Sequence, residues 1–317
     1  MHPSRPRWPW HLVTAAVIAA LGTGLYFSSR RVDYDWHWER IPDYVLSRGG
    51  ERVVAPVDGV AHPDADGRGI TIEARTDPPQ RARIEQVTRA LVGEGDLVFA
   101  GDPVAMREGW TAGPLLLGLA VTLQLSALAL VFALLLGLLA GLGRVSANPS
   151  AFALSTAYVE VVRGTPLLVQ IFIFYFFIGT VLRLSAFTAG VAALAVFTGA
   201  YVAEIVRAGI EAVPRGQMEA ARSLGMGTLQ AMRHVVLPQA LRKTLPPLAG
   251  QSINLVKDSS LVSVIAITDL SKAGREVVAS TFSAFEVWFS VAAMYLVLTG
   301  ALSVLVRRVE RRLAASD

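Results

Sequence analysis

The sequence predicts an all-α polytopic membrane protein with six transmembrane helices and one small β-rich insertion. Apolar side chains make up 53% of its 317 residues, the mean hydropathy is positive, and long apolar runs alternate with polar segments. Such runs are typical of helices that cross a bilayer. The chain contains no cysteine, which excludes a disulfide framework and a thiolate metal site.

The first apolar run extends from Leu12 to Phe27 and follows Arg5 and Arg7. Such a run is typical either of a cleaved signal peptide or of an anchoring helix. No small-residue cleavage site follows it, and it ends in serines and arginines. We therefore expect an uncleaved transmembrane anchor over residues 12–31, with residues 1–11 in the cytoplasm.

Residues 32–113 differ in composition from the rest of the chain. They are rich in Asp, Glu, Arg and Gly and contain no apolar run long enough to cross a bilayer. Short strand-like pieces at 52–56, 69–74 and 90–92 are separated by Gly, Pro and Asp turn signals. We expect a small β-rich lobe on the outer, periplasmic side, because the anchor before it runs outward.

Five further apolar runs follow the insertion. They extend over residues 115–142, 152–182, 187–206, 245–267 and 287–306. The second is interrupted by Arg163-Gly164-Thr165-Pro166, and Pro166 should bend or break its helix. With an anchor that starts inside, Arg144, the loop 207–243 and a basic tail over 307–317 all fall in the cytoplasm, as the positive-inside rule requires.

The polar and basic segment 213–238 lies between two of these runs and is predicted to form two short helices around a glycine turn. Pro214 suits a first helical position, and Gly225 most easily adopts the left-handed conformation that ends a helix. Pro238 should close the second helix. The helical pattern alone is equally typical of an amphipathic helix on the bilayer surface.

The sequence of this segment resembles the EAA loop of ABC importer permeases. The resemblance is carried by Glu219-Ala220-Ala221, by Gly225 and by Val235-x-Leu237-Pro238. In that family the loop is the coupling helix that docks on a separate cytoplasmic ATPase. The resemblance implies a coupling loop over 209–238 with these residues at the ATPase interface: Glu219, Ala220, Ala221, Arg222, Leu224, Gly225 and Pro238.

Three further stretches resemble the polar amino-acid importers of the histidine and glutamine type. They begin at Arg163-Gly164-Thr165-Pro166, at Ala200-Tyr201 and at Lys257-Asp258-Ser259-Ser260. The resemblance implies a permease domain over 114–306 with a five-helix importer core, to which the anchor and the lobe are additions. It also implies an inner-membrane protein with both termini in the cytoplasm. The implied partners are a dimer of ATP-binding subunits, a second permease copy or a sibling permease, a periplasmic solute-binding protein, membrane lipid and a polar amino-acid substrate.

Several polar residues fall within the predicted spans and are candidates for a translocation path or gate. They are Arg163, Thr165, Gln170, Glu204, Arg207, Asn254, Lys257, Asp258 and Ser259. The opposite charges near the cytoplasmic helix ends, Arg163, Glu160, Glu204 and Arg207, fit either structural ion pairs or an inner gate. Lys257 and Asp258 lie near mid-membrane, where an unpaired charge costs several kcal/mol, so this face should line the path or a seam between subunits.

An enzymatic function is not predicted. The five histidines lie outside the predicted spans or at their edges, and the chain contains no HExxH, GxSxG or phosphate-binding loop. We therefore expect no catalytic residue, metal, cofactor or nucleic-acid partner, with ATP hydrolysis on another chain. The alternative is an ion-driven secondary transporter or a channel, although such transporters often have repeated halves, which this sequence lacks.

Overall fold

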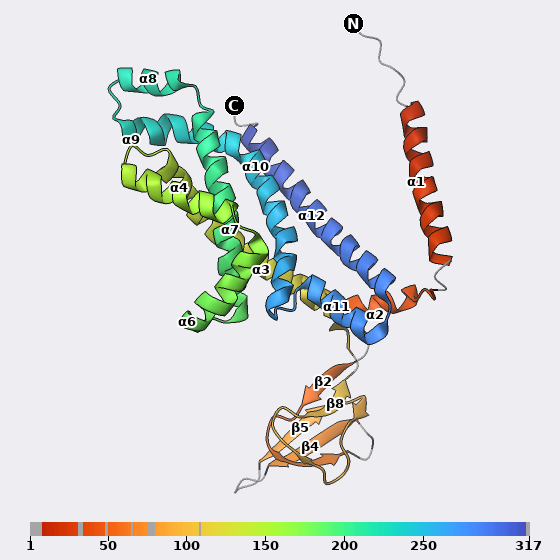
Figure 1. Ribbon diagram of the computed structural model, residues 1–317. Helices are drawn as coiled ribbons and strands as arrows, with labels where there is room; N and C mark the ends of the chain where they lie inside the picture. Colours follow the sequence, from red (N-terminus) through yellow and green to blue (C-terminus); the bar gives the residue numbers. More distant parts are fainter. Residues whose placement is uncertain are drawn as a thin grey trace. The chain divides into compact units, whose positions relative to one another are not determined.

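The computed structural model describes residues 8–30, 34–47, 50–64, 66, 68–74, 80–107 and 109–314 (Figure 1). The chain divides into two units, Met1–Glu39 and Arg40–Asp317. Most of the described residues are helical, and the strands are confined to one stretch of the second unit.

The first unit contains helix α1, Trp8–Arg30. The helix begins four residues before the predicted anchor, because Pro9 is tolerated in a first turn, where its missing N–H has no partner to lose. Its apolar part, Leu12–Ser28, is shorter than the roughly 20 residues of a typical span. Beyond the helix, Trp36 and Trp38 stack with ring centroids 5.7 Å apart.

The strands of the second unit lie between α2, Ile41–Val45, and α3, Pro114–Arg144. They are β1 Leu46–Ser47, β2 Glu51–Val54, β3 Gly59–Pro63, β4 Gly69–Ala74, β5 Arg81–Glu85, β6 Arg89–Ala90, β7 Leu97–Val98, β8 Pro103–Arg107 and β9 Thr111–Ala112. All their described pairings are antiparallel, in the orders β1-β9, β2-β8-β6 and β5-β4-β3-β7. Ile70, Ile72 and Val104 are fully buried in the lobe's own core. Strand β4 occupies the residues of the predicted strand 69–74.

The remaining helices follow the lobe in an order close to the predicted one. They are α4 Pro149–Arg163, α5 Leu167–Phe172, η2 Ile173–Gly179, α6 Thr180–Leu182, α7 Ala186–Glu211, α8 Arg215–Ser223, α9 Thr228–Ala231, η3 Met232–Val236, α10 Leu237–Asp258, η4 Ser259–Ile265, α11 Leu270–Thr281 and α12 Ala284–Ala314. Helix α7 is five residues longer at its end than the predicted span 187–206, so it reaches into the predicted coupling loop. Helix α11 was not predicted.

By length and composition, three described helices can cross a membrane: Pro114–Arg144, Ala186–Glu211 and the part Ala284–Arg308 of α12. The pair formed by α4 and α5–α6 makes a fourth if it counts as one span. The predicted run 245–267 does not stay one helix. It comprises the second half of α10, which contains Pro246 and Pro247, and the tighter turns of η4. The described residues therefore give three or four such spans against the six predicted.

The break predicted at Pro166 is confirmed. Helix α4 ends at Arg163, α5 begins at Leu167, and the two segments are bent by 105°. Because proline has no N–H and crowds the preceding turn, the chain leaves the helical conformation here.

The prediction that Pro238 closes a helix is wrong. The backbone stays helical from Thr228 through α9, η3 and α10 to Asp258. The wider π-type turns of η3 come directly before Pro238, and such a turn accommodates an interruption of the regular i to i−4 hydrogen bonds without ending the helix.

Helices α3 and α7 form the centre of the second unit through close backbone contact. A Cβ atom on Gly137 would lie 2.4 Å from Cβ of Val202, and one on Gly141 would lie 2.7 Å from Cβ of Val206. Small residues four apart on one face let helices approach closely, as they do in membrane proteins generally.

Candidate functional site

The predicted coupling loop folds as α8 followed by the turn at Gly225 and α9, which lie side by side (Figure 1). Gly225 has φ +82. Its N–H donates to the carbonyl of Arg222, and the N–H of Met226 donates to the carbonyl of Ala221. This pair of hydrogen bonds is the Schellman arrangement that satisfies the last carbonyls of a helix. A Cβ on Gly225 would meet nothing within 4 Å, so the glycine is required for its backbone conformation and not for space.

Helix α8 has one packed face and one open face. Ala221 is 3% exposed, and Met218 packs against the cluster of Val213 and Val236. Ala221 was predicted at the ATPase interface, but its side chain is buried and packs within this chain. The other predicted residues of the helix and turn are exposed: Glu219, Ala220, Arg222, Leu224 and Gly225.

Two large apolar side chains project from this loop. Leu224 is 85% exposed and Leu229 is 81% exposed, and they stand on either side of the Gly225 turn. Exposed apolar side chains that gather on a polar surface are typical of a protein contact site. Pro238 is also exposed, but it lies on α10 at the edge of an apolar groove and away from this turn.

The predicted charges near the helix ends meet at Glu204 on α7. Its carboxylate accepts hydrogen bonds from Arg144 at the end of α3 and from Nε of Arg207 at 3.2 Å, and Nη1 of Arg163 on α4 lies 3.8 Å away. Arg207 also pairs with Glu211. We call these five residues the Glu204 cluster. Charge-assisted hydrogen bonds, which are stronger than neutral ones, join α3 to α7 in this cluster, and the longer ion-pair contact of Arg163 adds α4.

The cluster opens onto a hollow of about 410 Å³ that Arg144, Glu160, Arg163 and Tyr201 help to line. The Arg163 guanidinium lies 5.3 Å from the centre of the Tyr201 ring, within cation–π distance. The prediction grouped Arg163, Glu160, Glu204 and Arg207; Glu160 lines the hollow without joining the cluster, and Arg144 and Glu211 were missed. The position of Arg144, directly at the end of an apolar run, was the available signal.

Gln170 and Thr165 stabilise the break between α4 and α5 through hydrogen bonds. Gln170 is 7% exposed, and its side-chain N–H groups donate to the carbonyl of Val162 at 2.8 Å and to Oγ1 of Thr165 at 2.7 Å. Thr165 donates in turn to the carbonyl of Val161. These bonds occupy carbonyls that the broken helix leaves without partners. Gln170 was predicted on a path for substrate; its amide N–H groups bond within the fold, whereas its buried Oε1 has no hydrogen-bond partner among the described residues.

The predicted polar face at the end of α10 is only partly open. Asn254 and Lys257 are exposed and Asp258 is partly buried, whereas Ser259 is fully buried and donates to the carbonyl of Val256 at 2.8 Å. Ser259 therefore does not line a path in this structure. Lys257 lines a hollow of about 300 Å³ together with Ser260, Ser271, Trp288 and Tyr295.

The family described as "binding-protein-dependent transport system inner membrane component" matches residues 133–315 of the chain. That is more than half of its length. The chain belongs to this family.

Curated relatives of this permease match the same part of the chain. It is 41% identical over 208 residues to the glutamine transport system permease protein GlnP of Escherichia coli, covering 64% of this chain and 95% of that protein. It is 45% identical over 196 residues to the probable glutamine ABC transporter permease protein GlnM of Bacillus subtilis, covering 62% of this chain and 91% of that protein.

Solved structures agree on the fold of the permease. A crystal structure of an amino acid ABC transporter with histidines is similar with a TM-score of 0.59 and 43% identity, covering 63% of this chain and 94% of that one. The inward-facing MetNI methionine ABC transporter is similar with a TM-score of 0.57 and 22% identity, covering 63% and 96%, and this second likeness concerns the fold alone.

The permease contains a buried polar network that the sequence did not indicate. Asp269 is fully buried and accepts hydrogen bonds from the backbone N–H groups of Ser271 and Lys272 at the start of α11. Tyr295 on α12 lies 3.1 Å from the Ser271 hydroxyl, and Thr122 on α3 accepts from the N–H of Leu270. The network fixes the unpredicted helix α11 between α3 and α12. Asp269 could have been found as an N-cap residue before a helical run.

Proposed function

We propose that this permease moves a polar amino acid across the bacterial inner membrane by alternating access. The chain is the permease component of an amino-acid ABC importer, in which a partner subunit hydrolyses ATP. The names of its relatives point to glutamine, a small polar cargo. The open end of α10 supports a site for such a zwitterion, because Lys257 offers a cation beside the Ser260, Ser271 and Tyr295 hydroxyls. Asp258, one position on, is not part of that hollow's lining and offers a carboxylate on the neighbouring face of the helix.

We infer that an ATP-binding subunit docks on the open face of α8. The observation that carries this proposal is the division of the loop into a packed face and an exposed one, with Leu224 and Leu229 exposed on both sides of the Gly225 turn. Glu219 and Arg222, three apart on the exposed face of α8, would add polar contacts. Two ATP-binding subunits need two such loops, so the working transporter contains a second permease copy or a sibling.

The topology we propose has both termini and the loop of α8 and α9 in the cytoplasm. Helix α1 is the first of six spans, and α10 with η4 is a span that is interrupted inside the membrane. The bend at Pro166 and the turns of η4 are stable at that depth only where they are buried in protein or line a watery cavity. The lobe of residues 46–112 then lies in the periplasm, on the side from which a solute-binding protein delivers its cargo.

The Glu204 cluster forms an inner gate at the cytoplasmic side of this path. It joins α3, α4 and α7, and the hollow beside it is open to solvent and lined by charges. We propose that relative motion of α4 and α7 during the transport cycle changes the contact of Arg163 with Glu204, which at 3.8 Å is the longest of the cluster's contacts to that carboxylate.

The proposal is tested by purifying the chain from membranes and assaying ATP hydrolysis with candidate solute-binding proteins. We expect an ATP-binding subunit to co-purify and a loaded glutamine-binding or related receptor to stimulate hydrolysis severalfold over the empty receptor. Stimulation only by receptors for apolar or sugar cargo would overturn the substrate class. Absence of any associated ATPase, with transport that follows an ion gradient, would favour the ion-driven alternative.

A further inference from the structure

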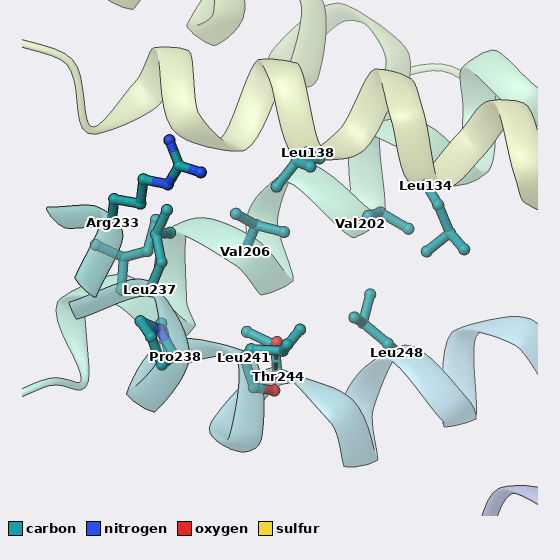
Figure 2. A pocket seen from close by; sticks show the side chains of 12 residues that line it. Leu134, Leu138, Val202, Val206, Arg233, Leu237, Pro238, Leu241, Thr244 and Leu248 are labelled. Carbon is teal, nitrogen blue, oxygen red and sulfur yellow. Dashed lines mark hydrogen bonds between the residues drawn. The ribbon is translucent and has the colours of Figure 1, made fainter. Parts of the chain in front are cut away.

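A long apolar groove runs between α3, α7 and α10 (Figure 2). Its volume is about 500 Å³, within the range of small-molecule sites. Leu134 and Leu138 of α3 form one wall, Val206 of α7 forms the floor, and Leu241 and Leu248 of α10 form the other wall. The single polar residue along the wall, Thr244, donates its hydroxyl hydrogen to the carbonyl of Leu241, so the groove offers a cargo no polar partner along its length.

One end of the groove carries a positive charge. Figure 2 shows Arg233 at the same end of the groove as Leu237 and Pro238, with its guanidinium directed toward α3, while Leu134 and Leu248 lie at the other end. The side chain of Arg233 is exposed and makes no ion pair or hydrogen bond with any of the residues that the structure describes. An unneutralised guanidinium at the mouth of an apolar channel is complementary to a phosphate joined to a hydrocarbon chain.

The length of the groove matches one leaflet of a bilayer. From Leu237 to Leu248 the chain advances eleven positions, or roughly 16 Å at about 1.5 Å per residue, and half of the roughly 30 Å hydrocarbon core is about 15 Å. Arg233 comes one helical turn before Leu237. With the apolar walls in the hydrocarbon, Arg233 lies at headgroup depth. Residues 237–243, which the sequence predicted in the cytoplasm, then lie in the cytoplasmic leaflet, with the side chains of Arg242 and Lys243 exposed.

We propose that this groove binds an anionic phospholipid, with one acyl chain along α10 and the phosphate at Arg233. With the proposed topology the lipid belongs to the cytoplasmic leaflet, directly beneath the loop of α8 and α9. Arg233 is part of η3, and η3 continues without a break into α10. The lipid would thus stabilise the helix that connects this loop to the membrane path. The lipid site itself requires only that α3, α7 and α10 lie in a bilayer and does not depend on the identity of the cargo.

A binding competition tests the proposal on the full-length chain with its co-purifying subunits. The delipidated complex is equilibrated with equal amounts of phosphatidylglycerol and phosphatidylcholine of the same acyl chains, and native mass spectrometry counts the lipids retained. We expect one retained lipid per chain with a preference for phosphatidylglycerol. Because a basic residue near the membrane surface contributes about a fivefold preference for anionic lipid, Arg233→Gln should bring the two lipids close to parity.

Matched variants separate this site from general surface charge. Arg307→Gln removes an exposed arginine at the end of α12, outside the groove, and should leave the preference unchanged. Leu241→Trp and, separately, Leu138→Trp fill the groove and should lower retention of both lipids; thermal melting verifies that each variant is folded. The proposal is overturned if Arg233→Gln keeps the full preference, if Arg307→Gln abolishes it, or if the filled variants that are folded retain lipid normally.

A cross-linking experiment distinguishes lipid from protein in the groove. Since the chain has no cysteine, Leu241→Cys introduces a unique thiol. Phosphatidylglycerol with a photoactivatable acyl chain should label peptides of α3 and α10, and the thiol should give no cross-linked dimer with a short bis-maleimide. A dimer through Leu241→Cys would assign the groove to a second copy, and photolabel confined to other helices would place the lipid elsewhere; either result overturns the proposal.

Discussion

The carboxylate of Glu204 accepts a hydrogen bond from Arg144, although sixty positions separate the two residues in the chain. The contact joins the end of α3 to α7, and the same carboxylate faces Arg163 and Arg207. The side chains of Arg144 and Glu204 are 16% and 27% exposed. The energy of a pair with this exposure lies between two limits. Surface ion pairs contribute about 0–1 kcal/mol, and disruption of a buried pair costs about 3–5 kcal/mol.

Glu204→Gln should therefore destabilise the permease by about 1–3 kcal/mol, because three arginines would surround an amide that cannot neutralise them. Thermal melting of the purified protein measures the effect, and a double-mutant cycle with Arg144→Gln isolates the pairwise energy. Glu160→Gln is the control, since Glu160 is exposed and lines the same hollow. Equal melting temperatures for Glu204→Gln and Glu160→Gln would contradict a structural role for the cluster.

Gly225 should tolerate replacement according to how readily the new residue adopts positive φ. Gly225→Asn should keep most of the coupled transport rate, whereas Gly225→Val should reduce it severalfold, because left-handed backbone costs an L-residue roughly 1–2 kcal/mol and a β-branched one more. ATP hydrolysis and uptake are measured together in proteoliposomes. Gly216→Ala is the matched control on α8, where a Cβ meets nothing within 4 Å. Full coupling in Gly225→Val would show that the turn is not needed for docking.

The sequence was informative where one local property decided the structure. Pro166 broke its helix as predicted, and Gly225 took the left-handed conformation because few other residues do so at low cost. Pro238 was misjudged because the π-type turns of η3 that accommodate it have no pattern in the sequence.

Burial depended on contacts that no local pattern records. Ser259 and Gln170 look like path residues in the sequence, yet both point into the protein and bond to backbone carbonyls. Arg144 joined the Glu204 cluster only because Gly137 and Gly141 bring α3 against α7. Long-range packing of this kind sets the partners of a charge, whereas hydropathy predicts only that the charge lies near a helix end.

Gln170→Leu should destabilise the permease without removing any group from a transport path. The substitution replaces the amide with an apolar side chain and removes its hydrogen bonds to the carbonyl of Val162 and to Oγ1 of Thr165. The Val162 carbonyl then keeps only the longer contact from Thr165 at 3.4 Å, and each lost hydrogen bond costs about 0.5–1.5 kcal/mol. Thermal melting and the substrate dependence of uptake are measured side by side. Gln124→Leu on the exposed face of α3 is the control. A changed substrate preference with an unchanged melting temperature would show that Gln170 lines the transport path.

Asp258→Asn should weaken uptake of a zwitterionic substrate by roughly tenfold, the effect of losing about 1.4 kcal/mol of interaction with the cargo's ammonium group. Initial rates of uptake over a range of substrate concentrations measure the change, together with competition by other amino acids. Glu276→Gln is the control, because it removes a carboxylate from α11 whose described ion pair, with Lys272, is local to that helix. An unchanged substrate profile in Asp258→Asn would leave this carboxylate with a structural role.

The lobe should be removable at its base, because its first and last strands pair with each other. In β1 and β9, Leu46 lies opposite Ala112 and Ser47 lies opposite Thr111. An Asn-Gly turn in place of residues 48–110 would therefore close a two-residue hairpin of the favoured type. We expect this variant to fold and to keep its ATP-binding partner, as judged by size-exclusion chromatography, thermal melting and co-purification.

Gly113→Val in the full-length chain provides the opposing test. A Cβ at Gly113 would lie 2.3 Å from the backbone oxygen of Tyr44, and Tyr44 packs with Leu115 and Leu270 in a core shared with α3 and α11. The single substitution should lower the melting temperature more than loss of the whole lobe does, because it disturbs the base that the helices share and the deletion does not. The opposite ranking, with the deletion variant aggregated or stripped of its ATPase, would mean that the lobe is a structural part of the transporter.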